Sequence, residues 1–234
     1  MREPQFHRIT DYDRSLLPNA HLRNMDAGVT DRDSWTEGSG LSVGYPAWGL
    51  LYYLTLCRLR PDTHNLVIET GTNQGASSIV LAQAIKDSPG TGTLRTVELE
   101  QPNLDIATDN FNNAGVADVI ETYRGDALDH LAAMVDHPSP LAVAFLDGNH
   151  FHKQVVREFE LVEPKLGHDS IVIFDNTYLI AEPQDDQRVN GALRTILNRF
   201  GGHLVNLPFC SWYTPGVAVW QRKPFEDMTP PSPK

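Results

Sequence analysis

The stretch NLVIETGTNQGASSIVLAQAIKD, residues 65–87, decides how this chain folds. Residues 65–71 form a short apolar run that ends in glycine, which is typical of a buried strand. Residues 76–87 have their apolar side chains at helical spacing. A strand that passes through a glycine-containing turn into a helix is the repeating unit of a parallel sheet, so this stretch predicts an α/β protein.

The same alternation of strand and helix continues along the chain. Further strands are predicted at 93–99, 119–125, 141–149, 170–176, 203–209 and 216–222, and further helices at 102–115, 127–137, 151–167 and 187–202. This order predicts a Rossmann-like sheet of seven mostly parallel strands with helices on both faces. The last two strands follow one another without a helix, so we expect them to pair antiparallel at one edge of the sheet, with the last strand antiparallel.

The two ends of the chain differ from this central region. The first forty-odd residues are polar and broken, and an apolar helix that begins near proline is predicted at 46–59. We therefore divide the chain into an N-terminal lid and cap helix (1–60), a catalytic domain (61–223) and a flexible, proline-rich tail (224–234).

Composition excludes several classes of protein. The chain has 30 acidic and 19 basic residues and a net charge of −11, which disfavours binding to nucleic acid or to an anionic membrane. Its start does not resemble a signal peptide, and no apolar run approaches the roughly 18 residues of a membrane span. We expect a cytoplasmic protein. The two cysteines, Cys57 and Cys210, cannot form a disulfide framework, and both are expected to be buried as small apolar residues.

Chemistry is expected where the strands end, because ligands of such sheets bind beyond the carboxyl ends of the strands. The first strand ends in a loop with Glu69, Gly71 and Gly75, which lacks both the dinucleotide fingerprint and the lysine of a phosphate loop. Glu98 ends the second strand and can accept ribose hydroxyls, and Asp126 follows the third strand, where it can meet an adenine edge. A tight turn and solvated carboxylates are the alternatives, but together these residues predict a nucleoside ligand without a pyrophosphate.

These strand ends resemble the S-adenosylmethionine site of class I methyltransferases, over about residues 65–222. The resemblance implies that Gly71 and Gly75 border the methionine part of the cofactor, that Glu98 holds the ribose, and that Asp126 and Ala127 flank the adenine. The full set of residues that it implies for cofactor binding is Glu69, Gly71, Thr72, Asn73, Gly75, Ser77, Glu98, Asp126, Ala127 and Asp147.

A second set of polar residues ends the fourth and fifth strands. Asp147 ends one strand, and Asp175 and Asn176 end the next. Neighbouring parallel strands end at the same edge of a sheet, so these oxygen-bearing side chains should converge, and such ligands suit Mg²⁺ or another hard divalent cation. The alternative is that they cap loops, as Asp and Asn often do. We predict a metal site of Asp147, Asp175 and Asn176.

This arrangement resembles the metal-dependent O-methyltransferases of the catechol and caffeoyl-coenzyme A type. Those enzymes have a lysine as general base three residues after the first metal aspartate, where this chain has His150. A histidine here is similar to macrolide-sugar O-methyltransferases, and the Asp-Gly-x-His stretch is also similar to cephalosporin-hydroxylase-like proteins. His150 is the predicted base, because an unperturbed histidine accepts a proton near neutral pH. A merely polar loop histidine is the alternative, and His152 is the next candidate for the base.

The predicted protein is an Mg²⁺-dependent O-methyltransferase that moves a methyl group from S-adenosylmethionine to a hydroxyl of a small acceptor. A saccharide or glycoside is the first choice of acceptor, and a catechol or other phenol is the alternative. A non-catalytic cofactor-binding protein or a hydroxylase-like relative is the second alternative. We expect a homodimer from the resemblance. Segment 177–190 is expected to form one wall of the acceptor site, with aromatic wall candidates at Trp35, Tyr45, Trp48, Tyr178, Trp212 and Tyr213.

Overall fold

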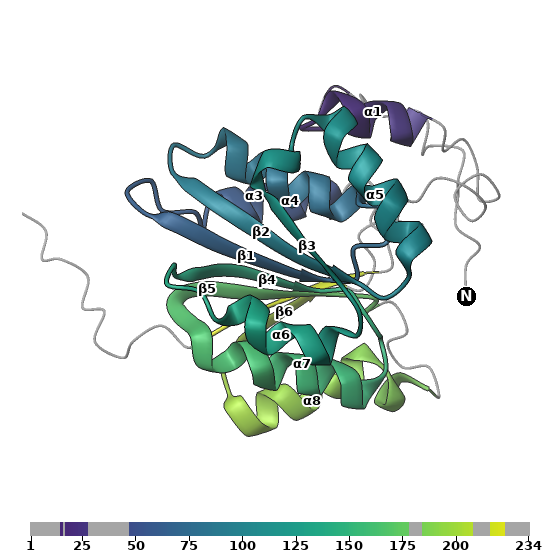
Figure 1. Ribbon diagram of the computed structural model, residues 1–234. Coiled ribbons are helices and arrows are strands. Elements are labelled where there is room, and N and C mark those ends of the chain that lie inside the picture. The colour runs from purple at the N-terminus through teal and green to yellow at the C-terminus, as the bar shows by residue number, and fades with distance from the viewer. Residues whose placement is uncertain (1–14, 16, 28–46, 178–183, 208–215, 223–234) are drawn as a thin grey trace, which may run out of the picture.

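The sheet of this protein contains seven strands in the order β3-β2-β1-β4-β5-β7-β6 (Figure 1). The computed structural model describes residues 15, 17–27, 47–177, 184–207 and 216–222. The strands are β1 (His64–Thr70), β2 (Thr91–Glu98), β3 (Ile120–Arg124), β4 (Leu141–Leu146), β5 (Leu166–Asp175), β6 (His203–Leu207) and β7 (Val217–Gln221). Five neighbouring strands, β3-β2-β1-β4-β5, pair in parallel, so their carboxyl ends share one edge of the sheet.

Helices cover both faces of the sheet, as the alternation of elements predicts (Figure 1). One face packs against α3 (Ala47–Leu56), α4 (Ala76–Asp87) and α5 (Gln101–Ala114), and the other against α6 (Ala127–Val135), α7 (His152–Val162) and α8 (Val189–Phe200). Successive residues of a strand point to opposite faces, so Val67 joins the first core while Leu66 and Ile68 join the second. This double burial explains why the strands appear as nearly continuous apolar runs.

The final strand, β7, runs antiparallel to its neighbours, as expected. β7 lies between β5 and β6 and is antiparallel to both of them. β6 therefore forms the edge of the sheet next to β7, and the connection between these two strands is short enough for an antiparallel pair. The predicted fold class, a Rossmann-like sheet of seven strands with an antiparallel last strand, is confirmed.

An aromatic cluster fixes α7 against the sheet. The Phe159 ring centroid lies 4.9 Å from that of Trp220 and 5.2 Å from that of Phe200, both in edge-to-face geometry, and 6.1 Å from that of Phe174. Aromatic pairs at such separations add to the stability from burial alone. Because α7 follows β4 directly, this anchoring determines where the first turns of α7 lie at the edge of the sheet.

The N-terminal region includes a helix, α1 (Ala20–Ala27), which its polar sequence does not reveal. α1 packs on α5, where His21 Nε2 lies 3.0 Å from Asn110 Oδ1. The Asn110 amide also donates to the Gln74 carbonyl in the glycine-containing turn after β1, at 2.8 Å. α1 is thus linked to that turn through one side chain. The remaining residues of the predicted lid (1–14, 16 and 28–46) lie outside the described residues.

One cysteine prediction is wrong. Cys57 is exposed, although it follows an apolar helix. The buried positions around the end of α3 are Leu51, Thr55 and Leu59, four residues apart, so Cys57 lies on the opposite side of that helical path. Trp48 is fully buried in the core, which is the expectation for an aromatic residue within an apolar helix. Cys210, Trp35, Tyr45, Tyr178, Trp212, Tyr213 and the tail 224–234 lie outside the described residues.

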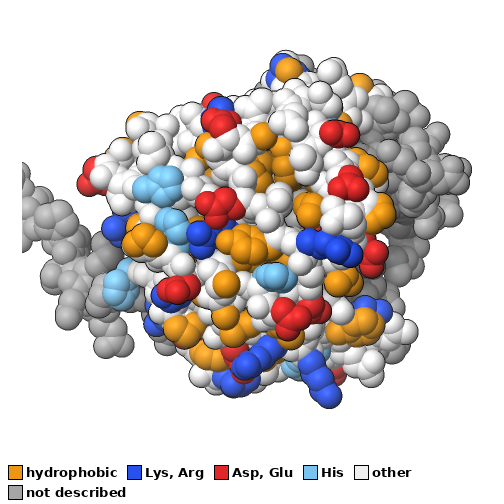
Figure 2. Space-filling view, in the orientation of Figure 1, with side chains coloured by type: hydrophobic (Ala, Val, Ile, Leu, Met, Phe, Trp, Pro, Cys, Tyr) orange, Lys and Arg blue, Asp and Glu red, His pale blue; other side chains and the backbone are white. Residues whose placement is uncertain are grey.

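Basic and acidic side chains are interspersed on the face seen in Figure 2 and do not separate into one basic and one acidic field. Within the described ranges, no helix is both long enough and apolar enough to cross a membrane.

Candidate active site

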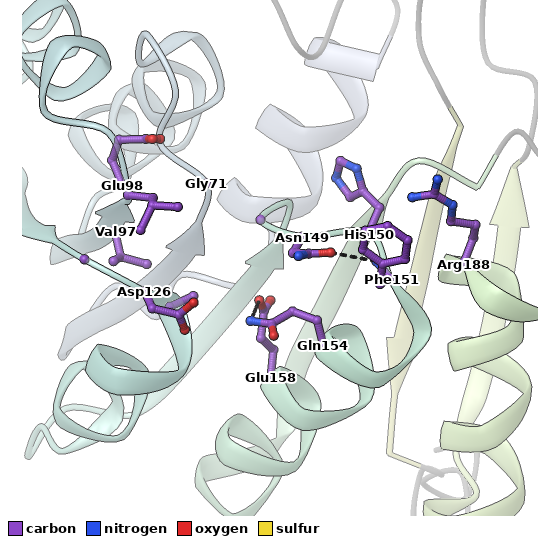
Figure 3. A pocket seen from close by; sticks show the side chains of 14 residues that line it. Gly71, Val97, Glu98, Asp126, Asn149, His150, Phe151, Gln154, Glu158 and Arg188 are labelled. Carbon is purple, nitrogen blue, oxygen red and sulfur yellow. Dashed lines mark hydrogen bonds between the residues drawn. The ribbon is translucent and has the colours of Figure 1, made fainter.

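A cavity of about 430 Å³ lies at the carboxyl ends of the parallel strands (Figure 3). Five predicted site residues line it, and these come from four different strand ends: Gly71, Glu98, Asp126, Ala127 and His150. The sequence did not single out the other lining residues: Val97, Leu99, Gly125, Gly148, Asn149, Phe151, Gln154, Glu158 and Arg188. Five of the predicted site residues therefore lie together at one cavity, and half of its wall comes from the start of α7 and its neighbourhood.

The turn after β1 requires glycine at two positions. Gly71 has φ +84°, and a Cβ atom there would lie 2.2 Å from the carbonyl oxygen of Asp147. Gly75 has φ +89°, and a Cβ atom there would lie 2.5 Å from the ring of Phe111 on α5. Both backbones are in the left-handed region that side chains disfavour. The two glycines therefore let β1 end in contact with the end of β4 and let α4 begin against α5.

Glu69 has a structural environment and does not line the cavity. Its carboxylate is fully buried and accepts hydrogen bonds from Ser77 Oγ (2.6 Å), Ser78 Oγ and Thr96 Oγ1 (2.7 Å). Thr72 joins the same network, with its Oγ1 2.6 Å from that of Thr96. Burial raises the pKa of Glu69 to about 7, although the hydroxyl donors oppose this shift. Glu69, Thr72 and Ser77 thus tie β1, β2 and α4 together behind the cavity.

Glu98 and Asp126 present carboxylates to the cavity, and both are oriented by backbone donors. Glu98 accepts from the N–H groups of Asn73 (2.7 Å) and Glu100 (2.9 Å), one on each oxygen. Each oxygen keeps a second lone pair for a ligand hydroxyl. Asp126 caps α6 by accepting from the Leu128 N–H at 2.8 Å. These contacts fix the directions in which the two carboxylates meet a ligand.

The predicted metal residues and the predicted base lie together where β4 and β5 end. His150 Nε2 lies 3.1 Å from Asp147 Oδ1 and 2.8 Å from Asn176 Nδ2. The Asn176 amide also donates to Asp175 Oδ2 at 3.1 Å. Asn176 has φ +62°, a conformation that asparagine tolerates and most residues do not. The expected convergence of Asp147, Asp175 and Asn176 is therefore present in the fold.

The electrostatics of this group fit a cation. Burial and the neighbouring Asp147 carboxylate raise the pKa of Asp175 well above its ordinary value. Asp175 Oδ1 is buried, and it has no hydrogen-bond partner among the described residues. Two close carboxylates with a buried, unsatisfied oxygen are stabilised by a positive charge between them. Across the described ranges no three His, Cys, Asp or Glu side chains are placed to hold a metal ion. The third ligand of this set would be the Asn176 amide oxygen, after rotation of the amide group that now directs its Nδ2 toward Asp175 and His150.

The two histidines that follow β4, His150 and His152, have different surroundings. His150 lines the cavity, and its burial lowers its pKa, although the carboxylates of Asp175 and Glu158 oppose that shift. His152 lies in the first turn of α7, where its ring contacts the Asp186 carbonyl oxygen at 2.8 Å and Thr195 Oγ1 at 2.9 Å. His152 does not line the cavity. Of the two, only His150 can reach a ligand there.

Comparisons with known proteins agree with this fold. The methyltransferase domain family matches residues 68–177, which extend from β1 to the predicted metal strand. A catechol O-methyltransferase of Mycobacterium tuberculosis is 29% identical over 141 residues, 58% of this chain, and the match spans only 60% of that protein's length. Residues 68–177 therefore match a methyltransferase domain family, and the predicted resemblance to class I methyltransferases is confirmed.

Solved structures share the fold over nearly the whole chain. The O-methyltransferase TomG from Streptomyces achromogenes, involved in tomaymycin synthesis and solved with SAM, is 24% identical and has a TM-score of 0.72, covering 95% of this chain and 99% of its own. An O-methyltransferase from Bacillus cereus in complex with SAH is 19% identical with a TM-score of 0.69, covering 93% of this chain and 100% of its own. At these identities the likeness shows the fold.

Gly71→Ala tests the close contact between β1 and β4. We expect it to lower the free energy of unfolding and to abolish cofactor binding, because a methyl group cannot be accommodated 2.2 Å from a backbone oxygen. Gly115→Ala is the matched control, since Gly115 also has positive φ (+68°) but would place its Cβ in open space. The control should lose only the roughly 1–2 kcal/mol of the left-handed conformation. Equal losses of stability, measured by chemical denaturation, would contradict the steric argument.

Glu69 should make the protein less stable as the pH rises. The folded protein keeps the Glu69 proton up to about pH 7, whereas the unfolded chain releases it near its ordinary pKa of 4.5. The free energy of unfolding should therefore fall between pH 5 and pH 8, by about 3 kcal/mol for this residue. Glu69→Gln should flatten that decline in denaturation experiments, and Glu160→Gln, on the outer side of α7, should leave it unchanged. An identical decline in wild type and Glu69→Gln would rule the assignment out.

Proposed function

We propose that this protein is an S-adenosylmethionine-dependent O-methyltransferase that acts on a hydroxyl of a small acceptor with the help of a divalent cation. The observation that supports it most is the position of Asp147, Asp175, Asn176 and His150 beside a cavity lined by Gly71 and Glu98. A cofactor site and a metal-type ligand set thus adjoin one another at one edge of the sheet. The methyltransferase domain that spans these strands supports the same reaction class.

The cofactor would lie across the ends of β1, β2 and β3. Glu98 would accept the ribose hydroxyls with its free lone pairs, and the backbone at Gly71 would let the methionine part approach closely. Asp126 and Ala127 would flank the adenine. Glu69, Thr72 and Ser77 would support this site from behind, because their side chains bond to one another and to neighbouring elements. Asn73 would act through its N–H, which orients Glu98.

For methyl transfer the protein must align the acceptor oxygen with the methyl group and remove the proton of the acceptor hydroxyl. The transfer from a sulfonium is an in-line displacement, so fixing the acceptor oxygen against the methyl group contributes several kcal/mol. His150 would accept the hydroxyl proton, and its neutral form is favoured by burial. Asp147, Asp175 and Asn176 would hold Mg²⁺, which when bound lowers the pKa of a coordinated hydroxyl.

The acceptor has two candidate classes. The histidine in place of the lysine base and the polar N-terminal segment favour a saccharide or glycoside hydroxyl. The Mycobacterium tuberculosis relative, a catechol O-methyltransferase, favours a catechol or related phenol. A hydroxylase-like activity would need a second histidine beside the carboxylates. His152 instead contacts Asp186 and Thr195, which disfavours that alternative.

His150→Ala tests the proposed base. We expect kcat to fall about 10²–10⁴-fold while SAH still binds, because a general base acts on the transfer step. His152→Ala is the matched control, since this histidine contacts α8 and its neighbourhood rather than the cavity. The control should keep near wild-type kcat. Near-normal turnover of His150→Ala, with both variants folded, would reject the role of His150.

An acceptor panel with and without metal tests the reaction as a whole. Release of SAH would be measured with sugars, glycosides and catechols, each in excess Mg²⁺ and each after treatment with EDTA. The proposal expects turnover with one acceptor class, its loss in EDTA and its recovery when Mg²⁺ is restored. Asp175→Asn should resemble the chelated wild type. Full turnover in EDTA would remove the metal from the mechanism, and absence of SAH binding would remove methyl transfer altogether.

A further inference from the structure

Glu158 is a buried carboxyl group that the proposed reaction does not use, although it lines the cavity. It projects from α7, and only 1% of the residue is exposed. Its Oε2 accepts from Thr70 Oγ1 at 2.9 Å, and its Oε1 accepts from Gln154 Nε2 at 3.1 Å. Both donors are neutral, and each oxygen keeps a lone pair. Glu158 is thus held rigidly and can still accept a hydrogen bond from a ligand.

Glycine at position 148 gives the cavity access to this carboxyl group. A Cβ atom on Gly148 would lie 3.3 Å from Glu158 Oε1, which is a tight contact between the end of β4 and α7. Because that atom is missing, Gly148 leaves room beside the Glu158 carboxyl group, and Gly148, Gln154 and Glu158 all line the cavity. Figure 3 shows the Gln154 and Glu158 side chains on α7, across from Asp126 at the start of α6. This part of the cavity wall is therefore polar and rich in acceptors.

Two apolar side chains of the cavity wall can contact a flat ring. Leu99 follows β2 and Phe151 precedes α7, and both line the cavity while remaining 59% and 53% exposed. Leu99 is adjacent to Glu98, which would hold the ribose of the proposed cofactor. A nucleobase attached to that ribose would then enter between these apolar side chains, with its polar edge toward α7.

We propose that Glu158, oriented by Thr70 and Gln154, determines nucleobase specificity by accepting a hydrogen bond from the 6-amino group of adenine. This inference rests on the proposed use of S-adenosylmethionine and adds a residue that reads its base. Adenine presents an amino donor beside a ring-nitrogen acceptor on its edge. The second N–H of the Gln154 amide is available to that ring nitrogen. Burial raises the pKa of Glu158 to about 7, which is consistent with a carboxyl group that lacks a cationic partner.

The chemistry predicts discrimination against a 6-oxo base. Hypoxanthine has an acceptor where adenine has its amino donor. At a pH above the Glu158 pKa of about 7, where this group is ionised, the hypoxanthine oxygen would face the carboxylate without a proton between them, so the binding is compared at such a pH. Buried polar groups left unpaired in this way are costly. The proposal therefore expects wild-type protein to bind SAH about 10- to 100-fold more tightly than its deaminated analogue, S-inosylhomocysteine.

Glu158→Gln tests the assignment by calorimetric titration of SAH and S-inosylhomocysteine against the full-length protein. The amide can present either an oxygen or an N–H to the base, so the preference for SAH should fall to within about threefold. Glu160→Gln is the matched control on the same helix, because Glu160 pairs with Arg157 and Arg199 on the outer surface. It should keep the wild-type ratio.

Several outcomes would overturn the proposal. An unchanged ratio in folded Glu158→Gln, loss of the ratio in Glu160→Gln, or equal binding of the two ligands by wild type would each do so. If Glu158→Gln does not fold, Gly148→Ala replaces it, since its methyl group would shield Glu158 from the base and should lower the ratio with Glu158 intact. Failure of wild type to bind SAH at all would instead contradict the proposed function.

Discussion

The end of β1 is held from both faces of the sheet by buried carboxyl groups, and the rest of the site depends on it. On one face Glu69 accepts from hydroxyls of α4 and β2, and on the other Thr70 donates to Glu158 of α7. Burying two carboxyl groups is unfavourable unless hydrogen bonds satisfy them. Here the donors are supplied by several neighbouring elements, so the arrangement forms only when those elements are in place around β1.

This arrangement also fixes the end of β4. The Asp147 N–H donates to the Thr70 carbonyl at 3.1 Å, and Gly71 packs directly against the Asp147 carbonyl. Asp147 therefore stands at a defined place relative to the cofactor side of the cavity, with His150 three residues further on. The proposed cofactor site and the proposed metal site are consequently positioned relative to one another by the same contact, the one between the ends of β1 and β4. Such fixed positioning is what an in-line transfer between two bound molecules requires.

Much of the site could be predicted because parallel strands bring their carboxyl ends to one edge. From the order of strands alone, Gly71, Glu98 and Asp126 were expected together, and all three line the cavity. The same rule brought Asp147, Asp175 and Asn176 together. The role of Glu69 was harder to predict, because a residue at a strand end can face the ligand or the helix behind it, and the next element decides which.

The sequence by itself determined the α/β class, the number of strands, the antiparallel last strand and the strand ends at which chemistry is expected. These follow from short-range periodicity and from glycine and proline positions, which act locally. Only the tertiary structure decided that Glu158 and Gln154 reach the cavity, that Cys57 is exposed and that His150 rather than His152 lines the cavity. Those outcomes depend on which face of a helix packs against the sheet. They also depend on the position of Gly148 beside Glu158, which leaves that carboxyl group uncovered. Both arrangements follow from packing between elements that are distant in the sequence.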